Sequence, residues 1–213
     1  AARPELVNDN LDNVDAVITT RELAQMIRES GINFMELQDE EFDNPVGQST
    51  GASVIFGTTG GVIEATLRTA CEWLTGEPLK KIEFHELRGL SGIREATLEI
   101  AGREFHIGIA NGLGNTRTLL EKIRSGEVHY DAIEIMACPG GCINGGGQPP
   151  HHNDWNILEK RARAIYVEDQ RKPVRKSHEN PAIIQLYDEY LGQPNSEKAH
   201  ALLHTYYQPK DFI

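Results

Sequence analysis

The feature that most constrains this chain is a glycine-rich loop that carries two cysteines. The loop follows an apolar, β-branched run at residues 132–136, which predicts a buried strand. Cys138 and Cys142 lie in the loop together with five glycines. Thiolates are ligands for soft metal centres, and glycine lets backbone N–H groups approach cluster sulfurs because no Cβ is in the way. The spacing alone is also typical of two packed cysteines, whereas a disulfide is less expected because nothing in the chain suggests secretion.

The full string at residues 137–149, ACPGGCINGGGQP, closely resembles the last cysteine motif in the H-cluster domain of iron-only (FeFe) hydrogenases. The resemblance implies that Cys138 holds a 4Fe–4S cubane. It implies that Cys142 is a second cubane ligand, whose sulfur bridges to the catalytic two-iron subcluster. On strand alternation Met136 points to the same side as Cys138. The resemblance makes Met136 a cluster-contacting residue, and core packing is its alternative role.

Other segments agree with the same family. Residues 47–65 look like a second glycine-rich segment, in which Phe56 and Gly57 would help to wall the two-iron pocket. Without the family, the glycines at 57–61 are equally typical of a tight turn into a helix. Residues 177–181 and 199–207 resemble the small-subunit segment. The resemblance runs from about Val14 to the C-terminus.

Two further cysteine motifs of the family are missing from this sequence. The third cysteine, Cys71, matches no ligand motif and lies in an apolar helical pattern, which indicates a packed helix residue. A cubane needs four thiolate ligands, so we expect this chain by itself to lack a complete cluster and to be inactive. The partner that would supply the other ligands is the upstream half of the H-cluster domain.

Apolar periodicity predicts an α/β fold, with a mostly parallel sheet, flanking helices, an antiparallel element and a helical C-terminal tail. We expect strands at 14–18, 53–56, 80–87 and 132–136, and a hairpin at 96–109. We expect helices at 19–31, 61–76 and 115–125, and in the tail at 155–168, 182–191 and 196–207. The expected division is a large-subunit lobe at 1–152 and a small-subunit-like segment at 153–213. Both glycine-rich loops then fall at the carboxyl ends of strands, where functional loops of such sheets lie.

Two histidine pairs invite a metal hypothesis and do not sustain it. The adjacent His151 and His152 would point to opposite faces of an extended chain. His200 and His204 share one helix face but lack the glutamate of a zinc-helix motif. We expect packing or interface roles for these side chains and for His178.

The 213 residues carry a formal net charge of −11, which disfavours a nucleic-acid partner, and no apolar run is long enough for a membrane span. The first hypothesis is part of a hydrogenase catalytic subunit, which interconverts protons plus electrons and dihydrogen. Its electron partner would be ferredoxin or an NAD(P)H-linked flavoprotein subunit. The alternative is a non-catalytic Narf-like iron–sulfur protein of cluster assembly or sensing. We expect a cytoplasmic location, with a periplasmic one left open.

Overall fold

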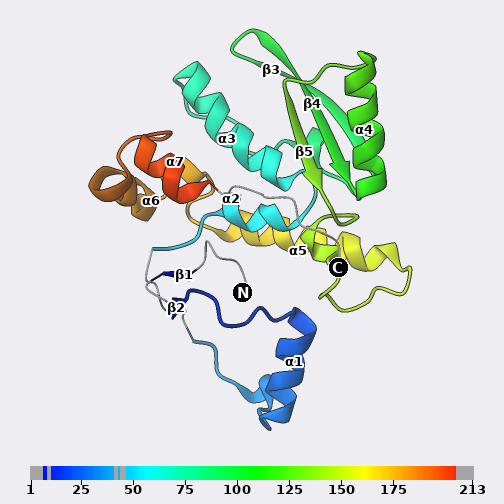
Figure 1. The fold of residues 1–213 in the computed structure, drawn as a ribbon, viewed down its shortest axis with the longest axis vertical. Helices are drawn as coiled ribbons and strands as arrows, with labels where there is room; N and C mark the ends of the chain where they lie inside the picture. Colours follow the sequence, from blue (N-terminus) through cyan, green and yellow to red (C-terminus); the bar gives the residue numbers. More distant parts are fainter. Residues whose placement is uncertain (1–6, 9–10, 41–42, 44–46, 205–213) are drawn as a thin grey trace.

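A computed structural model describes residues 7–8, 11–40, 43 and 47–204. The central body is a small sheet with helices on both sides, shown in Figure 1. The sheet has the order β3 (Ile93–Ile100), β4 (Arg103–Asn111) and β5 (Ala132–Met136). Strands β3 and β4 are antiparallel, and β5 runs parallel to β4, with Asn111 opposite Met136. The α/β class with an antiparallel element is therefore confirmed.

The predicted hairpin is confirmed as β3 and β4. Ala101 and Gly102 join the strands with positive φ angles of 53° and 74°. Two residues of positive φ form the tight turn whose twist matches the two flanking strands. The connection from β4 to the parallel β5 runs through α4 (Leu113–Ser125), also as predicted.

Helix α3 (Gly61–Thr75) covers the sheet on the side opposite α4 (Figure 1). It ends where Gly76 adopts a left-handed φ of 70°, a conformation that glycine reaches without strain. The core forms where α3 meets the sheet, and its fully buried side chains include Leu87, Ile107 and Ile109.

The region before α3 holds short elements. β1 (Val7–Asn8) and β2 (Leu11–Asp12) form a two-residue ladder. Helix α1 (Thr20–Glu29) begins with the predicted capping box, in which the Thr19 hydroxyl accepts from Glu22 N and the Glu22 carboxylate accepts from Thr19 N. A 3₁₀ turn, η2 (Phe34–Glu36), follows.

The C-terminal tail is helical, as predicted. Helix α5 (Trp155–Arg171) packs against α2 (Gly51–Val54) and the 3₁₀ helix η3 (Ile55–Gly57). Beyond it lie the 3₁₀ turn η6 (Ser177–Glu179), α6 (Pro181–Leu186), the π-helical turn η7 (Tyr187–Leu191) and α7 (Glu197–Leu203). The predicted final helix extends to 207, and its last three residues lie outside the described part of the chain.

Three expected strands are wrong. Residues 14–18 are irregular and largely exposed, and no strand of the described residues pairs with them. Residues 53–56 belong to α2 and η3, because the Thr50 hydroxyl accepts from Ser53 N and starts a helical turn. Residues 80–87 are an irregular segment that ends in the 3₁₀ turn η4 (His85–Leu87). Without these strands, the described sheet has one parallel pair rather than several.

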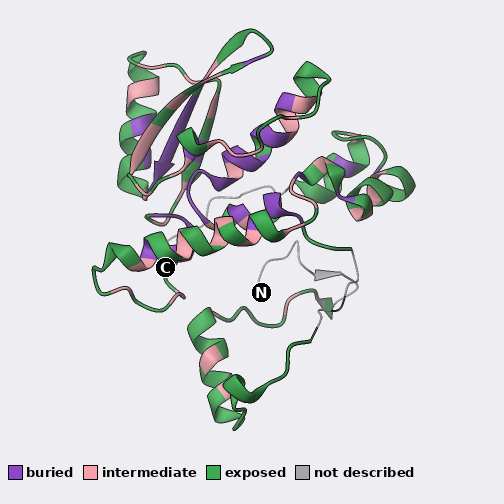
Figure 2. Cartoon of the chain, turned by 180° about the vertical axis from the view of Figure 1, so that it is seen from behind, coloured by how far each residue is buried: buried purple, intermediate pink, exposed green. Residues whose placement is uncertain are grey.

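Burial is concentrated around α2, α3 and β4 (Figure 2), whereas α5 has two buried residues, Leu158 and Asp169. Helix α1 has no buried residue. Among the described residues, none of the helices combines the length and the apolar character needed to cross a bilayer.

Candidate metal centre

The two candidate thiols lie on a tight turn directly after β5. Gly141 N donates to Cys138 O at 3.0 Å, which closes the turn, and Cys142 starts the 3₁₀ helix η5 (Cys142–Asn144). Gly140 and Gly141 have φ angles of 81° and 95°, conformations that other residues rarely adopt. The chain therefore reverses within three residues and brings the cysteine backbones close together.

The other glycine-rich loop lies against this turn. Thr59 N donates to Gly140 O at 3.1 Å. A Cβ added at Gly141 would come within 2.8 Å of Thr59 N, within 2.8 Å of the Met136 sulfur and within 3.1 Å of Gly57 O. Only glycine fits this contact, so the glycine at 141 allows the two loops to meet. The expectation that both glycine-rich loops lie at the carboxyl ends of strands holds for the loop after β5. It is wrong for the first loop, which follows the helical turns α2 and η3 but still lies against the cysteine turn.

A buried carboxylate of β5 holds the first loop in place. Glu134 accepts from Gly60 N at 2.6 Å and from Ile63 N at 3.0 Å, and the Thr59 hydroxyl donates to it at 3.4 Å. These amides belong to the unpaired first turn of α3, where a negative charge is also favoured by the helix dipole. The Arg94 guanidinium donates to the Thr59 hydroxyl at 3.3 Å, and burial lowers the pKa of Arg94.

A buried amide holds the cysteine turn from the opposite side. Asn111, 1% exposed, ends β4 and accepts from Gly140 N at 2.8 Å through its side-chain oxygen. Its NH₂ group donates to Ser91 O at 2.8 Å. Gly112 N donates to Met136 O at 2.8 Å, which fixes the end of β5 beside the same residue.

The predicted site residues are only partly brought together. Met136 and Gly57 lie beside the cysteine turn, through the Met136 sulfur and the Gly57 carbonyl. The Phe56 side chain is 47% exposed and lines a separate groove of about 280 Å³ with Trp73 on the outer face of α3. The cluster-facing role of Phe56 stays a prediction that this placement does not support.

The turn fits part of a metal–sulfur site. All three cysteines are free thiols, of which Cys142 is exposed, Cys138 partly exposed and Cys71 buried. Cys71 packs in the core between α3 and the sheet, as predicted, and burial raises the pKa of its thiol. The turn therefore offers two soft donors on a tight glycine loop, and Cys71 is in no position to join them.

The other histidine clusters have structural contacts that account for their positions. His200 and His204 stack with their ring centres 4.2 Å apart. Glu72, His178 and Glu179 come close enough to share an ion, but the Lys176 ammonium lies between the two carboxylates and binds Glu72 at 2.8 Å. His178 Nε2 lies 2.7 Å from Glu72. This cluster is an ion-pair network that attaches the tail to α3.

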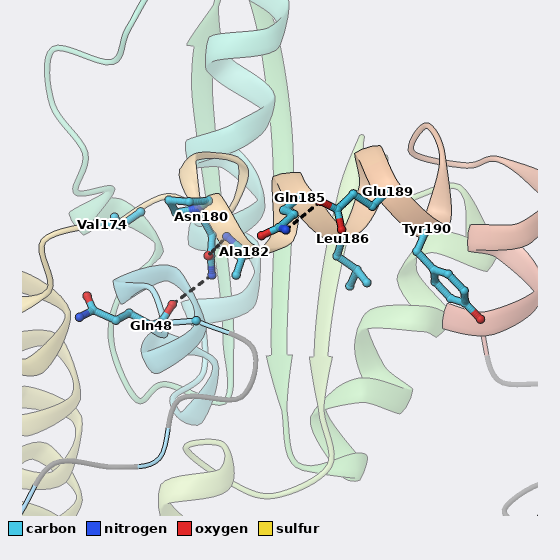
Figure 3. Close-up of a pocket in the computed structure, with 10 residues that line it drawn as sticks. Gln48, Val174, Asn180, Ala182, Gln185, Leu186, Glu189 and Tyr190 are labelled. Carbon is cyan, nitrogen blue, oxygen red and sulfur yellow. Dashed lines mark hydrogen bonds between the residues drawn. The ribbon is translucent and has the colours of Figure 1, made fainter.

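The described surface also has a larger groove of about 550 Å³, shown in Figure 3. It lies between Gln48 and the α6–η7 segment, with Asn180 donating to Gln48 O at 3.2 Å across one end. The groove belongs to the tail and takes no part in the cysteine turn.

Comparison with known proteins gives consistent results. Residues 1–146 match the family "Iron only hydrogenase large subunit, C-terminal domain", and residues 156–210 match "Iron hydrogenase small subunit". The chain is 58% identical over 207 residues to the NADP-reducing hydrogenase subunit HndD of Solidesulfovibrio fructosivorans, covering 97% of this chain and 35% of that protein. It is 44% identical over 214 residues to iron hydrogenase 1 of Clostridium pasteurianum, covering 98% of this chain and 37% of that protein.

Solved structures similar to this chain are also iron-only hydrogenases. A structure of HydA that describes stepwise H-cluster assembly has a TM-score of 0.76 and 43% identity, over 96% of this chain and 58% of that one. A variant of HydA1 from Chlamydomonas reinhardtii has a TM-score of 0.75 and 42% identity, over 95% of this chain and 58% of that one. Over the matched region the chain thus has the fold of iron-only hydrogenases. It belongs to the iron-only hydrogenase family, and it spans about a third of the length of HndD and of iron hydrogenase 1, and 58% of the HydA chains.

Sequence reasoning missed two residues that hold this site, Asn111 and Glu134. A signal for each was present, because a polar residue interrupts an apolar strand in IGIAN and in AIEIM. A buried polar side chain needs a hydrogen-bond partner, so each of these positions indicates a non-local contact.

Proposed function

We propose that this chain is the lobe of a hydrogenase catalytic subunit that supplies two of the cluster thiolates, Cys138 and Cys142. The whole subunit would interconvert protons plus electrons and dihydrogen. The observation that carries the proposal is the cysteine turn itself: two accessible thiols after β5, on a loop that only glycines could form, beside a second glycine-rich loop.

The chain's own contribution is to bind and to shield. Cys138 and Cys142 would be ligands, with Cys142 also bridging to the two-iron subcluster, and Met136 would contact the cluster from the same side. When bound, the iron–sulfur centre supplies the redox chemistry and the site where dihydrogen is split or formed. Backbone amides near the turn would donate to the cluster sulfurs, which tunes the reduction potential.

We propose that the remaining ligands come from the part of the family's domain that lies upstream of this chain. Its contact surface would include the N-terminal arm, residues 11–40. Large apolar side chains of the arm are exposed, among them Val17 at 77%, Phe34 at 64% and Met35 at 88%. The arm also touches the cysteine loop, since Arg21 donates to Gly146 O at 2.7 Å. A surface that is both apolar and next to the turn suits a lobe that would complete the site.

The electron partner would be an NAD(P)H-linked flavoprotein subunit, in line with the name of the HndD relative, or ferredoxin. We propose a cytoplasmic location. A relative from Nitratidesulfovibrio vulgaris is called a periplasmic hydrogenase large subunit, and it is 45% identical over 165 residues. Cell fractionation with an antibody against the chain separates the two locations.

The test of the main proposal is a pair of cysteine variants in the full-length parent protein, produced so that it carries both the cubane and the two-iron subcluster, because iron and sulfide alone would rebuild only the cubane. We expect Cys142→Ala to abolish hydrogen turnover, because the thiolate that joins the two parts of the centre is lost. The control Cys71→Ala should keep nearly full turnover, since Cys71 packs in the core. Full turnover in Cys142→Ala, or its loss in a well-folded Cys71→Ala protein, would contradict the assignment.

The alternative function is a Narf-like protein of iron–sulfur cluster assembly or sensing. Protein NAR1 of Arabidopsis thaliana is 31% identical over 98% of this chain, and the cytosolic iron–sulfur assembly component 3 of Mus musculus is also 31% identical. The higher identity to hydrogenases favours the enzyme. A full-length parent that binds an iron–sulfur cluster but shows no hydrogen turnover with an artificial electron donor would favour the alternative.

A further inference from the structure

We infer that Asn111 is a positioning residue for the Cys138–Cys142 thiol pair and that it acts through the peptide of Gly140. This inference deepens the proposed function, because it rests on the two thiols being ligands. Gly140 is the middle residue between the cysteines, and both of its backbone polar groups are held by residues far away in the sequence.

The contacts of Gly140 determine its orientation. Its N–H donates to Asn111 Oδ1 at 2.8 Å, and its carbonyl accepts from Thr59 N at 3.1 Å. The two peptide groups that flank the Gly140 Cα are therefore each held by one hydrogen bond, and φ or ψ of Gly140 cannot change much without breaking one of them. Because Gly140 is two residues from each cysteine, such a rotation would move the two thiols relative to each other.

Asn111 is well anchored for this role. Its NH₂ group donates to Ser91 O, and its own backbone N–H donates to Gly92 O at 2.9 Å. It also ends β4, opposite Met136 in the parallel ladder, so its Cα is fixed by the sheet. The side chain is short and buried, and its amide makes a hydrogen bond at each end, which favours one rotamer. Asn111 therefore holds Gly140 at a fixed position relative to the sheet.

The first experiment measures the reactivity of the thiols in this chain without any metal. Alkylation of the three cysteines is followed by mass spectrometry. In Asn111→Leu, which keeps a similar volume but has no acceptor, we expect Cys138 to react about fivefold faster, the factor that one typical hydrogen bond contributes. Asn111→Asp keeps an acceptor for Gly140 N but loses the donor to Ser91 O and adds a charge, so it serves as a comparison only for hydrogen exchange of the Gly140 amide.

Two controls come from the same region. Asn115→Ala removes a neighbouring amide that donates to Asn111 O but does not touch the turn, so the Cys138 rate should not change. Cys71 should stay unreactive in each folded variant, which shows that the core is intact. An unchanged Cys138 rate in a folded Asn111→Leu protein would overturn the inference.

A second measurement applies even if Asn111→Leu does not fold. Hydrogen exchange of the Gly140 amide should be slow in the original chain and in Asn111→Asp. Fast exchange of this amide in the original chain would also overturn the inference, because the hydrogen bond to Asn111 would then be mostly open.

The third experiment uses the full-length parent loaded with iron and sulfide. Asn111→Leu should shift the reduction potential and the EPR spectrum of the cluster, whereas the control Asn115→Ala should leave both unchanged. Faster Cys138 alkylation with an unchanged potential and spectrum would refute positioning toward the cluster. Faster alkylation in a parent that binds no iron would refute the proposed function and leave the role of Asn111 in the thiol turn standing.

Discussion

The two ends of the chain meet the central body in different ways. The tail joins α3 through charges that are almost completely buried: Arg68 donates to both oxygens of Asp169 at 2.8 Å, and Glu64 accepts from the same guanidinium at 2.8 Å. The N-terminal arm has the opposite character. Its apolar side chains are exposed. Its described links to the cysteine loop are two hydrogen bonds, from Arg21 to Gly146 O at 2.7 Å and to Gly147 O at 3.3 Å, and the packing of the Thr19 side-chain carbons on Gly147.

The difference shows that apolar side chains do not by themselves fix a segment on the body. Buried charges hold the tail in place, whereas the more apolar arm is held by few contacts. The tail junction is specific because each buried charge has a partner, and a buried charge without a partner is costly. Arg175 adds a second cation, which donates to Asp169 Oδ2 at 2.7 Å. The arm has no such constraint, so its position depends on the fold of α1 and on whatever covers its apolar face.

The largest effect should come from breaking the tail junction. Asp169→Ala would leave Arg68 buried without its main partner, and we expect the free energy of unfolding to fall by about 3–5 kcal/mol. Urea unfolding followed by circular dichroism measures this change. The control Glu168→Ala, one residue earlier and 45% exposed in its side chain, should change the free energy of unfolding by less than about 0.5 kcal/mol. Similar losses in both variants would show that the buried pair is not special.

The second prediction concerns the pH dependence of stability at Glu72, which joins α3 to Lys176 and His178 of the tail. Burial acts to raise the pKa of Glu72, but hydrogen bonds from Lys176, Leu79 N and His178 bring it down to about 2. Because this pKa is below the ordinary value of 4.5, the contribution of Glu72 is fully present above pH 4.5 and is lost as the pH falls toward 2.

Glu72→Gln should therefore lower the free energy of unfolding by about 1–3 kcal/mol at neutral pH, because charge-assisted hydrogen bonds are lost. The difference from the original chain should shrink as the pH falls from 4.5 toward 2. Chemical denaturation at a series of pH values measures it. A difference that stays constant over this range would show that the ionised carboxylate is not what holds Lys176 and His178.

A smaller and local effect is expected in the arm. Thr19→Ala removes the cap of α1, which is typically worth about 1 kcal/mol to a helix. Since α1 buries no residue, the loss should appear as faster hydrogen exchange in residues 20–29, with little change in global urea unfolding. An equal drop in global stability would mean that the arm and the body unfold as one unit, and the comparison between the two ends would fail.

The smallest effect should come from the apolar face of α1. Met26 is 51% exposed, and we expect Met26→Gln to change the free energy of unfolding by less than about 0.5 kcal/mol. The matched variant Leu119→Ala, in the fully buried face of α4, should cost about 2–5 kcal/mol. A large loss in Met26→Gln would show that its face is already covered in solution.

The sequence predicts those elements whose signals are local. The capping box at Thr19, the Gly76 terminus of α3 and the Ala101–Gly102 hairpin are each encoded within a few residues, and each is confirmed. The strands expected at 14–18, 53–56 and 80–87 fail because a short apolar run does not determine its own partner. Whether it becomes a strand depends on a neighbouring edge that local periodicity does not reveal.

The residues of the candidate site also divide into those with a local sequence signal and those without one. The motif and the strand before it predict where Cys138 and Cys142 lie. The groups that fix their turn come from distant parts of the sequence: Asn111 is 29 residues from Gly140, and Glu134 is 74 residues from Gly60. Such contacts become visible only when the fold brings the two segments together.

The buried pair of Arg68 and Asp169 has one more consequence, for how the tail finds its place. A shift of α5 by a single residue would turn Asp169 about 100° around the helix axis and separate it from Arg68. An apolar face would tolerate such slippage, since one aliphatic side chain replaces another with little loss. The ionic junction instead accepts a single alignment, so a tail supplied as a separate polypeptide would still be recognised in the correct register.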